Sequence, residues 1–133
     1  MKIYCDANIF IDYFDDREDN IRPLKDFAFL FFQKGIGCRF DIVVSDWLLH
    51  ELKKHLKEDQ INGILNQFKE KGKLFFVEQK KEDWENAKKH SKHPDDYLHA
   101  VLAKRANADY LTTRNIRDYE DCDLVTIILP EFI

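Results

Sequence analysis

Residues 3–12 read IYCDANIFID, and this stretch decides the fold because a short apolar run stops there at a carboxylate, Asp6. A run of this length predicts a buried strand. Further apolar runs follow at residues 42–44, 74–77, 110–112 and 124–129. Helical patterns lie between most of them, at about 21–34, 47–56, 61–68, 81–89 and 94–102. This rhythm predicts a three-layer α/β/α fold, in which helices cover both faces of a parallel sheet of about five strands.

Several residues mark where the predicted helices begin and end. Gly35 and Gly37 are expected to end the first long helix. Ser45 stands at the N-cap position of the next helix, and Pro94 occupies a first-turn position that proline tolerates. Asp6 and Asp96 also stand at helix starts, where a carboxylate is favoured by the helix dipole.

The composition is that of one globular domain spanning residues 1–133, with 44% hydrophobic residues. The formal net charge of −4 argues against a protein that coats nucleic acid by electrostatics alone. It does not exclude a nuclease, because clustered carboxylates that bind cations lower the formal charge. The chain shows no signal-peptide pattern, and its longest apolar run, Phe27 to Phe32, is far shorter than a membrane span. A soluble, cytoplasmic protein is expected.

Acidic and amide side chains follow the predicted strands. Asp6 follows the first strand, while Asn115 and Asp118 follow the fourth. Glu51 lies about two turns along the helix after the second strand, and Asp96 begins the helix before the fourth. In an open parallel sheet these groups meet at the carboxyl edge, where Mg²⁺ or Mn²⁺ would offset their repulsion. Such a site suits phosphodiester hydrolysis. Taken alone, each acid is better explained as a helix cap or a solvated surface group than as a metal ligand.

Four segments resemble the signatures of PIN-domain ribonucleases, in the same order along the chain. They read DANIFID (6–12), SDWLLHEL (45–52), DYLHAVLA (96–103) and ADYLTTRNIRDY (108–119). The resemblance implies that Asp6, Glu51 and Asp96 bind the metal ion. The fourth position stays open: many PIN domains carry Asp where this chain has Asn115, while bacterial toxin members often pair Asn with an acid three residues later, as Asp118 stands here.

Four further residues are expected to support the site. Asn8 is a candidate for orienting Asp6, and Ser45 and Thr113 for hydrogen bonding a carboxylate or a phosphate. Plain capping or turn roles remain the alternative for these three. Arg114 flanks the site and is a candidate phosphate ligand.

Two other polar residues are assigned structural roles. Asp12 is expected to face solvent one helical turn beyond Asn8, and His99 is expected to be a packing residue one turn beyond Asp96.

The resemblance implies a metal-dependent endoribonuclease that hydrolyses RNA, of the VapC-like toxin kind, held inactive by an antitoxin protein. It also implies a homodimer, for which residues 27–32 or the helix at 61–68 would supply apolar surface. Two alternatives stay open: a housekeeping RNA-processing PIN nuclease, and a degenerate PIN domain that binds RNA or protein without cutting. A dehalogenase-like phosphotransferase is disfavoured because Asn8 replaces the second acid of that pattern.

Overall fold

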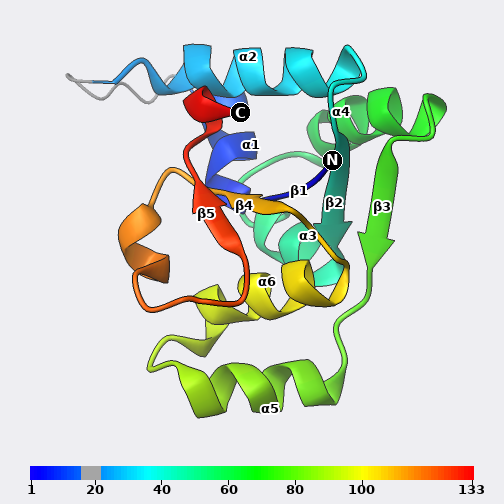
Figure 1. Cartoon of the computed structure of the whole chain (residues 1–133). Helices are drawn as coiled ribbons and strands as arrows, with labels where there is room; N and C mark the ends of the chain where they lie inside the picture. The colour runs from blue at the N-terminus through cyan, green and yellow to red at the C-terminus, as the bar shows by residue number, and fades with distance from the viewer. Residues whose placement is uncertain (16–21) are drawn as a thin grey trace.

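The five apolar runs form one parallel sheet (Figure 1) in a computed structural model that describes residues 1–15 and 22–133. The strands are β1 (Lys2–Cys5), β2 (Asp41–Ser45), β3 (Leu74–Val77), β4 (Tyr110–Thr112) and β5 (Thr126–Ile128), in the order β3-β2-β1-β4-β5. The run at 124–129 is a strand only in its centre. All four neighbouring pairs are parallel, so every strand ends at the same edge of the sheet.

Helices connect the strands and cover both faces of the sheet. They are α1 (Ala7–Phe14), α2 (Leu24–Ile36), α3 (Asp46–Leu52), α4 (Glu58–Glu70), α5 (Lys81–His90) and α6 (Pro94–Arg105). Two short 3-10 helices, η1 (Ile116–Tyr119) and η2 (Pro130–Phe132), follow β4 and β5. The layers are plain in Figure 1, where α2 and the paired helices α5 and α6 lie on opposite sides of the sheet. The predicted three-layer α/β/α fold is confirmed.

Two predicted helix boundaries differ from those observed, and a third cannot be compared. The expected start of the first long helix at Ile21 lies outside the described residues. Gly35 does not end α2 but lies buried within it, and the helix closes at Gly37. The absence of a side chain at Gly35 lets Phe68 approach, because a Cβ there would stand 2.5 Å from the Phe68 ring. Helix α3 ends at Leu52 rather than at Leu56, since the chain makes turns over residues 53–55.

Alternation along the strands divides the core into two faces. Ile3 and Cys5 point to one face, which we call the phenylalanine face because its buried aromatic residues are all phenylalanine. These are Phe10, Phe31, Phe32, Phe40 and Phe68. Tyr4 points to the other, which we call the tyrosine face because its buried aromatic residues are Tyr4, Tyr97 and Tyr119. Helices α1, α2 and α4 pack on the first face, and α5 and α6 on the second.

Candidate metal centre

Asp6 lies where the order of the strands reverses. The chain builds β2 and β3 on one side of β1 and then returns to place β4 and β5 on the other side. In open parallel sheets the binding crevice forms at the carboxyl end of this switch point. Asp6 follows β1 directly, its backbone N–H donates to the carbonyl of Thr112 at 3.0 Å, and the residue is 9% exposed.

The Asp6 carboxylate is held from both sides of the switch point. Its Oδ1 accepts a hydrogen bond from the backbone N–H of Ala7 at 2.7 Å and so caps α1. Its Oδ2 accepts from Thr113 Oγ1 at 2.9 Å and from the Tyr119 hydroxyl at 3.2 Å. Asn8 Nδ2 lies 3.5 Å from the same oxygen and 3.0 Å from Thr113 Oγ1. The predicted carboxylate contact of Thr113 is therefore present, and Asn8 reaches Asp6 chiefly through Thr113.

Glu51 reaches the same place along α3. This helix begins at Ser45, whose hydroxyl oxygen accepts a hydrogen bond from the Leu48 N–H at 3.0 Å. Ser45 therefore has the capping role, and its other hydrogen bond is to Tyr4 rather than to a carboxylate. About two turns of helix carry Glu51 from this cap to the crevice that contains Asp6.

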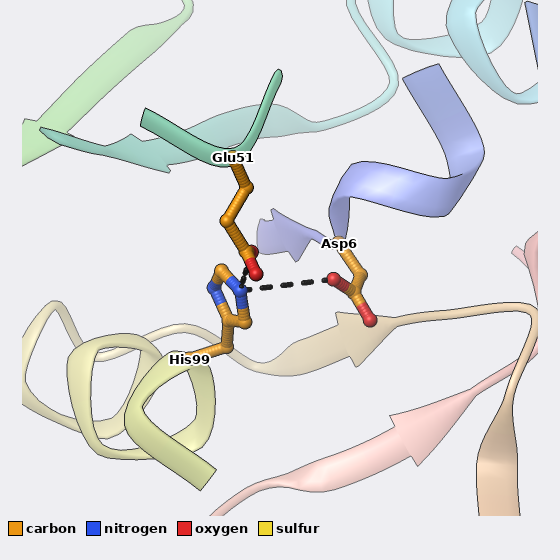
Figure 2. A group of neighbouring side chains, drawn as sticks. All are labelled: Asp6, Glu51 and His99. Carbon is orange, nitrogen blue, oxygen red and sulfur yellow. Dashed lines mark hydrogen bonds and ion pairs between the residues drawn. The ribbon is translucent and has the colours of Figure 1, made fainter. Parts of the chain in front are cut away.

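His99 joins the two carboxylates, as Figure 2 shows. Its Nε2 forms a short hydrogen bond with Glu51 Oε1 and lies 3.9 Å from Asp6 Oδ1. One ligand atom from each of Asp6, Glu51 and His99 lies within 4.8 Å of the other two. His99 is 1% exposed, but the prediction that it is only a packing residue is wrong. Sequence spacing gave no signal for this contact because Glu51 and His99 lie 48 residues apart.

Acidic neighbours set the pKa of His99. Burial alone would lower the pKa of this imidazole, but the hydrogen bond to Glu51 and the negative charges of Asp6, Glu51 and Asp96 outweigh burial and raise it. The pKa of Tyr119 is raised well above its usual value, first by burial and then by the charge of Asp6. Tyr119 therefore remains a hydroxyl donor at neutral pH, a role that the sequence did not indicate.

Asp96 completes the acidic cluster from the first turn of α6. Its pKa is raised by partial burial, then by the charge of Asp118, and then by that of Asp6. Asp118 and Asn115 lie exposed in or beside η1, at the rim of the site. The backbone N–H of Asn115 donates to Thr113 Oγ1 at 3.1 Å. The structure therefore gathers all five predicted residues at one edge of the sheet, with Asp6 and Glu51 at the centre.

Asp12 does not face solvent as predicted. It is 2% exposed, and its Oδ2 accepts a hydrogen bond from Arg114 Nε at 2.9 Å. The loop after β4 crosses α1 at this point, because the backbone N–H of Arg114 also donates to Asn8 Oδ1 at 3.1 Å. The predicted phosphate ligand Arg114 is therefore turned toward a buried carboxylate.

A groove of about 730 Å³ opens beside the acidic cluster. It is lined by Arg22, Arg114, Asn115, Ile116, Arg117, Asp118 and Leu129. Three of these lining residues carry guanidinium groups, and Arg22 also forms an ion pair with Glu131 at 2.7 Å. The site thus has an acidic centre and a margin that contains positive charge.

The donor set fits a hard divalent cation. Asp6 and Glu51 offer carboxylate oxygens from two separate elements, and Asp96 and Asp118 add negative charge nearby. Oxygen ligands of this kind are those that Mg²⁺ and Mn²⁺ prefer. In the described part of the chain, the only positively charged group in direct contact with the two central carboxylates would be a protonated His99.

No family model matches the chain, and no curated protein matches it. Among solved structures, the chain is similar to one from the crystal structure of VapBC2 from Rickettsia felis bound to a DNA fragment from their promoter. The TM-score is 0.64 at 18% sequence identity, over 97% of this chain and 98% of that chain. The likeness extends over nearly the full length of both chains. The PIN-like fold expected from the sequence signatures is thus the fold that this chain has.

Proposed function

We propose that this protein is a metal-dependent endoribonuclease that hydrolyses RNA phosphodiester bonds and acts as the toxin of a toxin–antitoxin pair. The observation that carries the proposal is the meeting of Asp6 and Glu51 at the switch point of the sheet. Carboxylates brought together from distant elements, with no Lys or Arg side chain paired to them in the described residues, are the usual ligands of a catalytic Mg²⁺ or Mn²⁺.

The proposed roles follow from where each side chain lies. Asp6 and Glu51 would hold the ion, and Asp96 and Asp118 would add negative charge to its surroundings. Asn115 at the rim orients a water or a phosphate oxygen. Once bound, a divalent ion supplies an acidified water and stabilises charge on the phosphate. Thr113 and Tyr119 keep the Asp6 carboxylate in place during that chemistry.

The groove beside the cluster supports a nucleic-acid substrate. Two of its three arginines are paired with carboxylates, Arg22 with Glu131 and Arg114 with Asp12, so the exposed Arg117 is the one that offers positive charge to a polyanionic backbone. Arg117 is exposed and is the better placed phosphate ligand, because Arg114 is bonded to Asp12. The choice of RNA rests on the resemblance of the four sequence segments to PIN-domain ribonucleases.

A protein partner is part of the proposal. The similar solved structure is a VapBC2 complex, which supports the proposal that an antitoxin binds this chain.

A homodimer is also proposed, with apolar surface on α2, where Phe29 is 47% and Leu30 is 53% exposed. The second surface expected from sequence is wrong: the apolar residues of α4 are buried in the core, and the most exposed of them, Leu65, is 8% exposed. In the described residues, no helix is long and apolar enough to cross a membrane. Action in the cytoplasm, where RNA is found, remains part of the proposal.

The test is RNA cleavage with Mg²⁺, Mn²⁺ or EDTA, comparing the unchanged protein with Asp6→Asn. Asparagine keeps an oxygen that caps α1 but removes the negative charge, so the fold is expected to survive. Asp109→Asn is the matched control, because the Asp109 carboxylate accepts a hydrogen bond from the Lys2 N–H at 2.8 Å at the opposite edge of the sheet. We expect metal-dependent cleavage that Asp6→Asn lowers by at least about 100-fold and Asp109→Asn leaves unchanged.

Two results would contradict the nuclease. Equal cleavage by both variants would place the activity elsewhere or in a contaminant. If neither the unchanged protein nor either variant cleaves RNA, and calorimetry detects no Mn²⁺ binding, a degenerate PIN domain that binds RNA or protein is the better explanation. Growth arrest on expression, relieved by Asp6→Asn, separates the toxin from a housekeeping RNA-processing enzyme.

A further inference from the structure

A line of buried polar groups, from Ser45 through Tyr4 to His99, runs behind Glu51. It begins at Ser45 Oγ, which lies 2.6 Å from the Tyr4 hydroxyl. The Tyr4 hydroxyl in turn lies 2.7 Å from His99 Nδ1, and His99 Nε2 contacts Glu51. Ser45 and Tyr4 are each 0% exposed, and His99 is 1% exposed. The large majority of polar groups this deeply buried in proteins are hydrogen-bonded, because an unpaired buried donor is costly.

The hydrogens of this line can be assigned because the choices are few. Ser45 Oγ already accepts the Leu48 N–H, and Tyr4 is its only other hydrogen-bond partner in the described part of the chain. The Ser45 hydroxyl hydrogen must therefore go to the Tyr4 oxygen. The single hydroxyl hydrogen of Tyr4 then goes to His99 Nδ1, which must carry a lone pair.

This assignment places the His99 ring proton on Nε2, facing Glu51, and leaves none on Nδ1. The reverse direction would put the proton on Nδ1 and turn the Nε2 lone pair toward the Glu51 carboxylate, so that two acceptors would face each other. It would also leave the Ser45 hydroxyl hydrogen without an acceptor. Only the direction from Ser45 to Glu51 satisfies every donor.

We propose that Ser45, Tyr4 and His99 form a positioning relay that fixes His99 as an Nε2–H donor and thereby holds the Glu51 carboxylate in its metal-binding orientation. His99 is then a positioning residue, neither a metal ligand nor a general base, because both of its ring nitrogens are already used. This inference rests on the proposed function in that Glu51 is taken to bind the metal ion.

Glu51 depends on the relay more than Asp6 does, because fewer contacts fix its side chain. Asp6 is fixed by Ala7, Thr113 and Tyr119, whereas Glu51 has a longer side chain that is 27% exposed. Among the described residues, His99 is the only side chain with which Glu51 forms a hydrogen bond or ion pair. Removing a residue that hydrogen-bonds a metal ligand typically lowers metal affinity by about 10–100-fold. Loss of the His99 donor is expected to have an effect of that size.

Two substitutions of His99 separate positioning from packing. In His99→Gln the amide nitrogen can occupy the place of Nε2 and donate to Glu51. In His99→Asn the shorter side chain can meet Tyr4 but cannot reach Glu51. We expect Mn²⁺ affinity, measured by calorimetry, to stay within about 3-fold for Gln and to fall about 10–100-fold for Asn. Equal losses in two variants that melt at the same temperature would overturn the relay and leave only a packing role.

The tautomer itself gives a second test that needs no RNA. Nitrogen-15 NMR of histidine-labelled protein in saturating Mg²⁺ distinguishes a protonated Nε2 from a protonated Nδ1. We expect a protonated Nε2 and a bare Nδ1 at His99, and loss of this fixed tautomer in Tyr4→Phe. A protonated Nδ1, or an Nε2 signal shifted by direct metal binding, would contradict the proposal.

Failure of this inference and failure of the proposed function leave different results. If RNA is cut and Asp6→Asn stops cleavage while Gln and Asn at position 99 behave alike, the nuclease stands and the relay is wrong. If the unchanged protein neither binds Mn²⁺ nor cuts RNA, the nuclease is wrong. The NMR spectrum of the metal-free protein then decides whether His99 still donates to Glu51.

Discussion

The two faces of the sheet bury aromatic residues of different kinds. On the phenylalanine face the buried rings pack against aliphatic side chains and against one another, as between Phe31 and Phe40, whose centroids lie 4.8 Å apart. On the tyrosine face the ring of Tyr4 carries a hydroxyl into the polar line behind Glu51, and that of Tyr119 carries one to Asp6. The first face stabilises the fold through apolar burial alone. The second also buries hydroxyl groups that form hydrogen bonds with polar side chains near the site.

The comparison teaches where substitutions should act. Removing a ring from the phenylalanine face loses apolar burial and leaves a cavity, but it touches no charged group. Changing a polar group on or near the tyrosine face alters the electrostatics of the site with a smaller effect on stability. Three substitutions test this difference, taken from the largest expected effect to the smallest.

Phe68→Ala is expected to lower the free energy of unfolding most, by about 3–5 kcal/mol. Phe68 is fully buried and packs against Phe32 and Phe40 at the centre of the phenylalanine face. Urea denaturation followed by circular dichroism measures the change. Phe132→Ala is the control, because Phe132 is 71% exposed and its loss should cost less than about 0.5 kcal/mol. Similar losses in both variants would mean that the core is not centred on Phe68.

Gly35→Ala is expected to destabilise the protein by about 1–3 kcal/mol through overpacking. The added Cβ would stand 2.5 Å from Phe68 Cε1 and 2.8 Å from Phe40 Cζ. Gly63→Ala is a matched control, since Gly63 lies in helix α4 with nothing within 4 Å of the added atom. That control should stabilise by about 0.5–1 kcal/mol because alanine favours helix. A stabilising Gly35→Ala would show that the phenylalanine face has spare room.

Asp96→Asn is expected to stabilise the metal-free protein at pH 7.5, by less than about 1 kcal/mol because the carboxyl is only partly buried. The pKa of Asp96 is raised by burial and by Asp118 and Asp6, so the folded protein holds this proton more tightly than the unfolded chain does. Stability therefore falls as pH rises through the raised pKa, and the neutral amide removes that loss. The same substitution should weaken Mn²⁺ binding.

Thermal unfolding in EDTA measures this effect, with Asp95→Asn as the control in the same helix turn. Asp95 is exposed, so its substitution should cost about 0.3–1 kcal/mol through the lost interaction with the helix dipole. If Asp96→Asn unfolds at a lower temperature than Asp95→Asn, the acidic cluster does not strain the metal-free fold. The advantage of Asp96→Asn should shrink as the pH is lowered, because the native carboxyl, whose pKa is raised, then takes up its proton.

Local pattern was sufficient for most of the fold. The apolar runs at 42–44 and 74–77 became β2 and β3 within a residue of their predicted ends, because a buried strand must be apolar along its length. Gly35 was predicted to end helix α2, because glycine often marks a helix terminus, but the helix continues past it. Here it marks a close approach between α2 and the Phe68 ring, which depends on a partner 33 residues away.

The site was predictable only where its residues matched a known pattern. Asp6, Glu51 and Asp96 were proposed from the resemblance, and the structure brings them to one edge of the sheet. His99 and Asp12 were assigned to packing and to solvent, and both assignments are wrong. Their partners, Glu51 and Arg114, come from other elements, so spacing along one helix could not indicate them.

The sequence by itself determined which segments are strands and which acids follow them, because burial and strand termination are read from neighbouring residues. Only the tertiary structure decided what each acid touches. The order β3-β2-β1-β4-β5 places β1 between β2 and β4, so Asp6 meets Thr113 after β4, while Ser45 at the end of β2 meets Tyr4 in β1. These contacts join residues 107 and 41 positions apart, and the pairing of strands, which no local pattern encodes, brings them together.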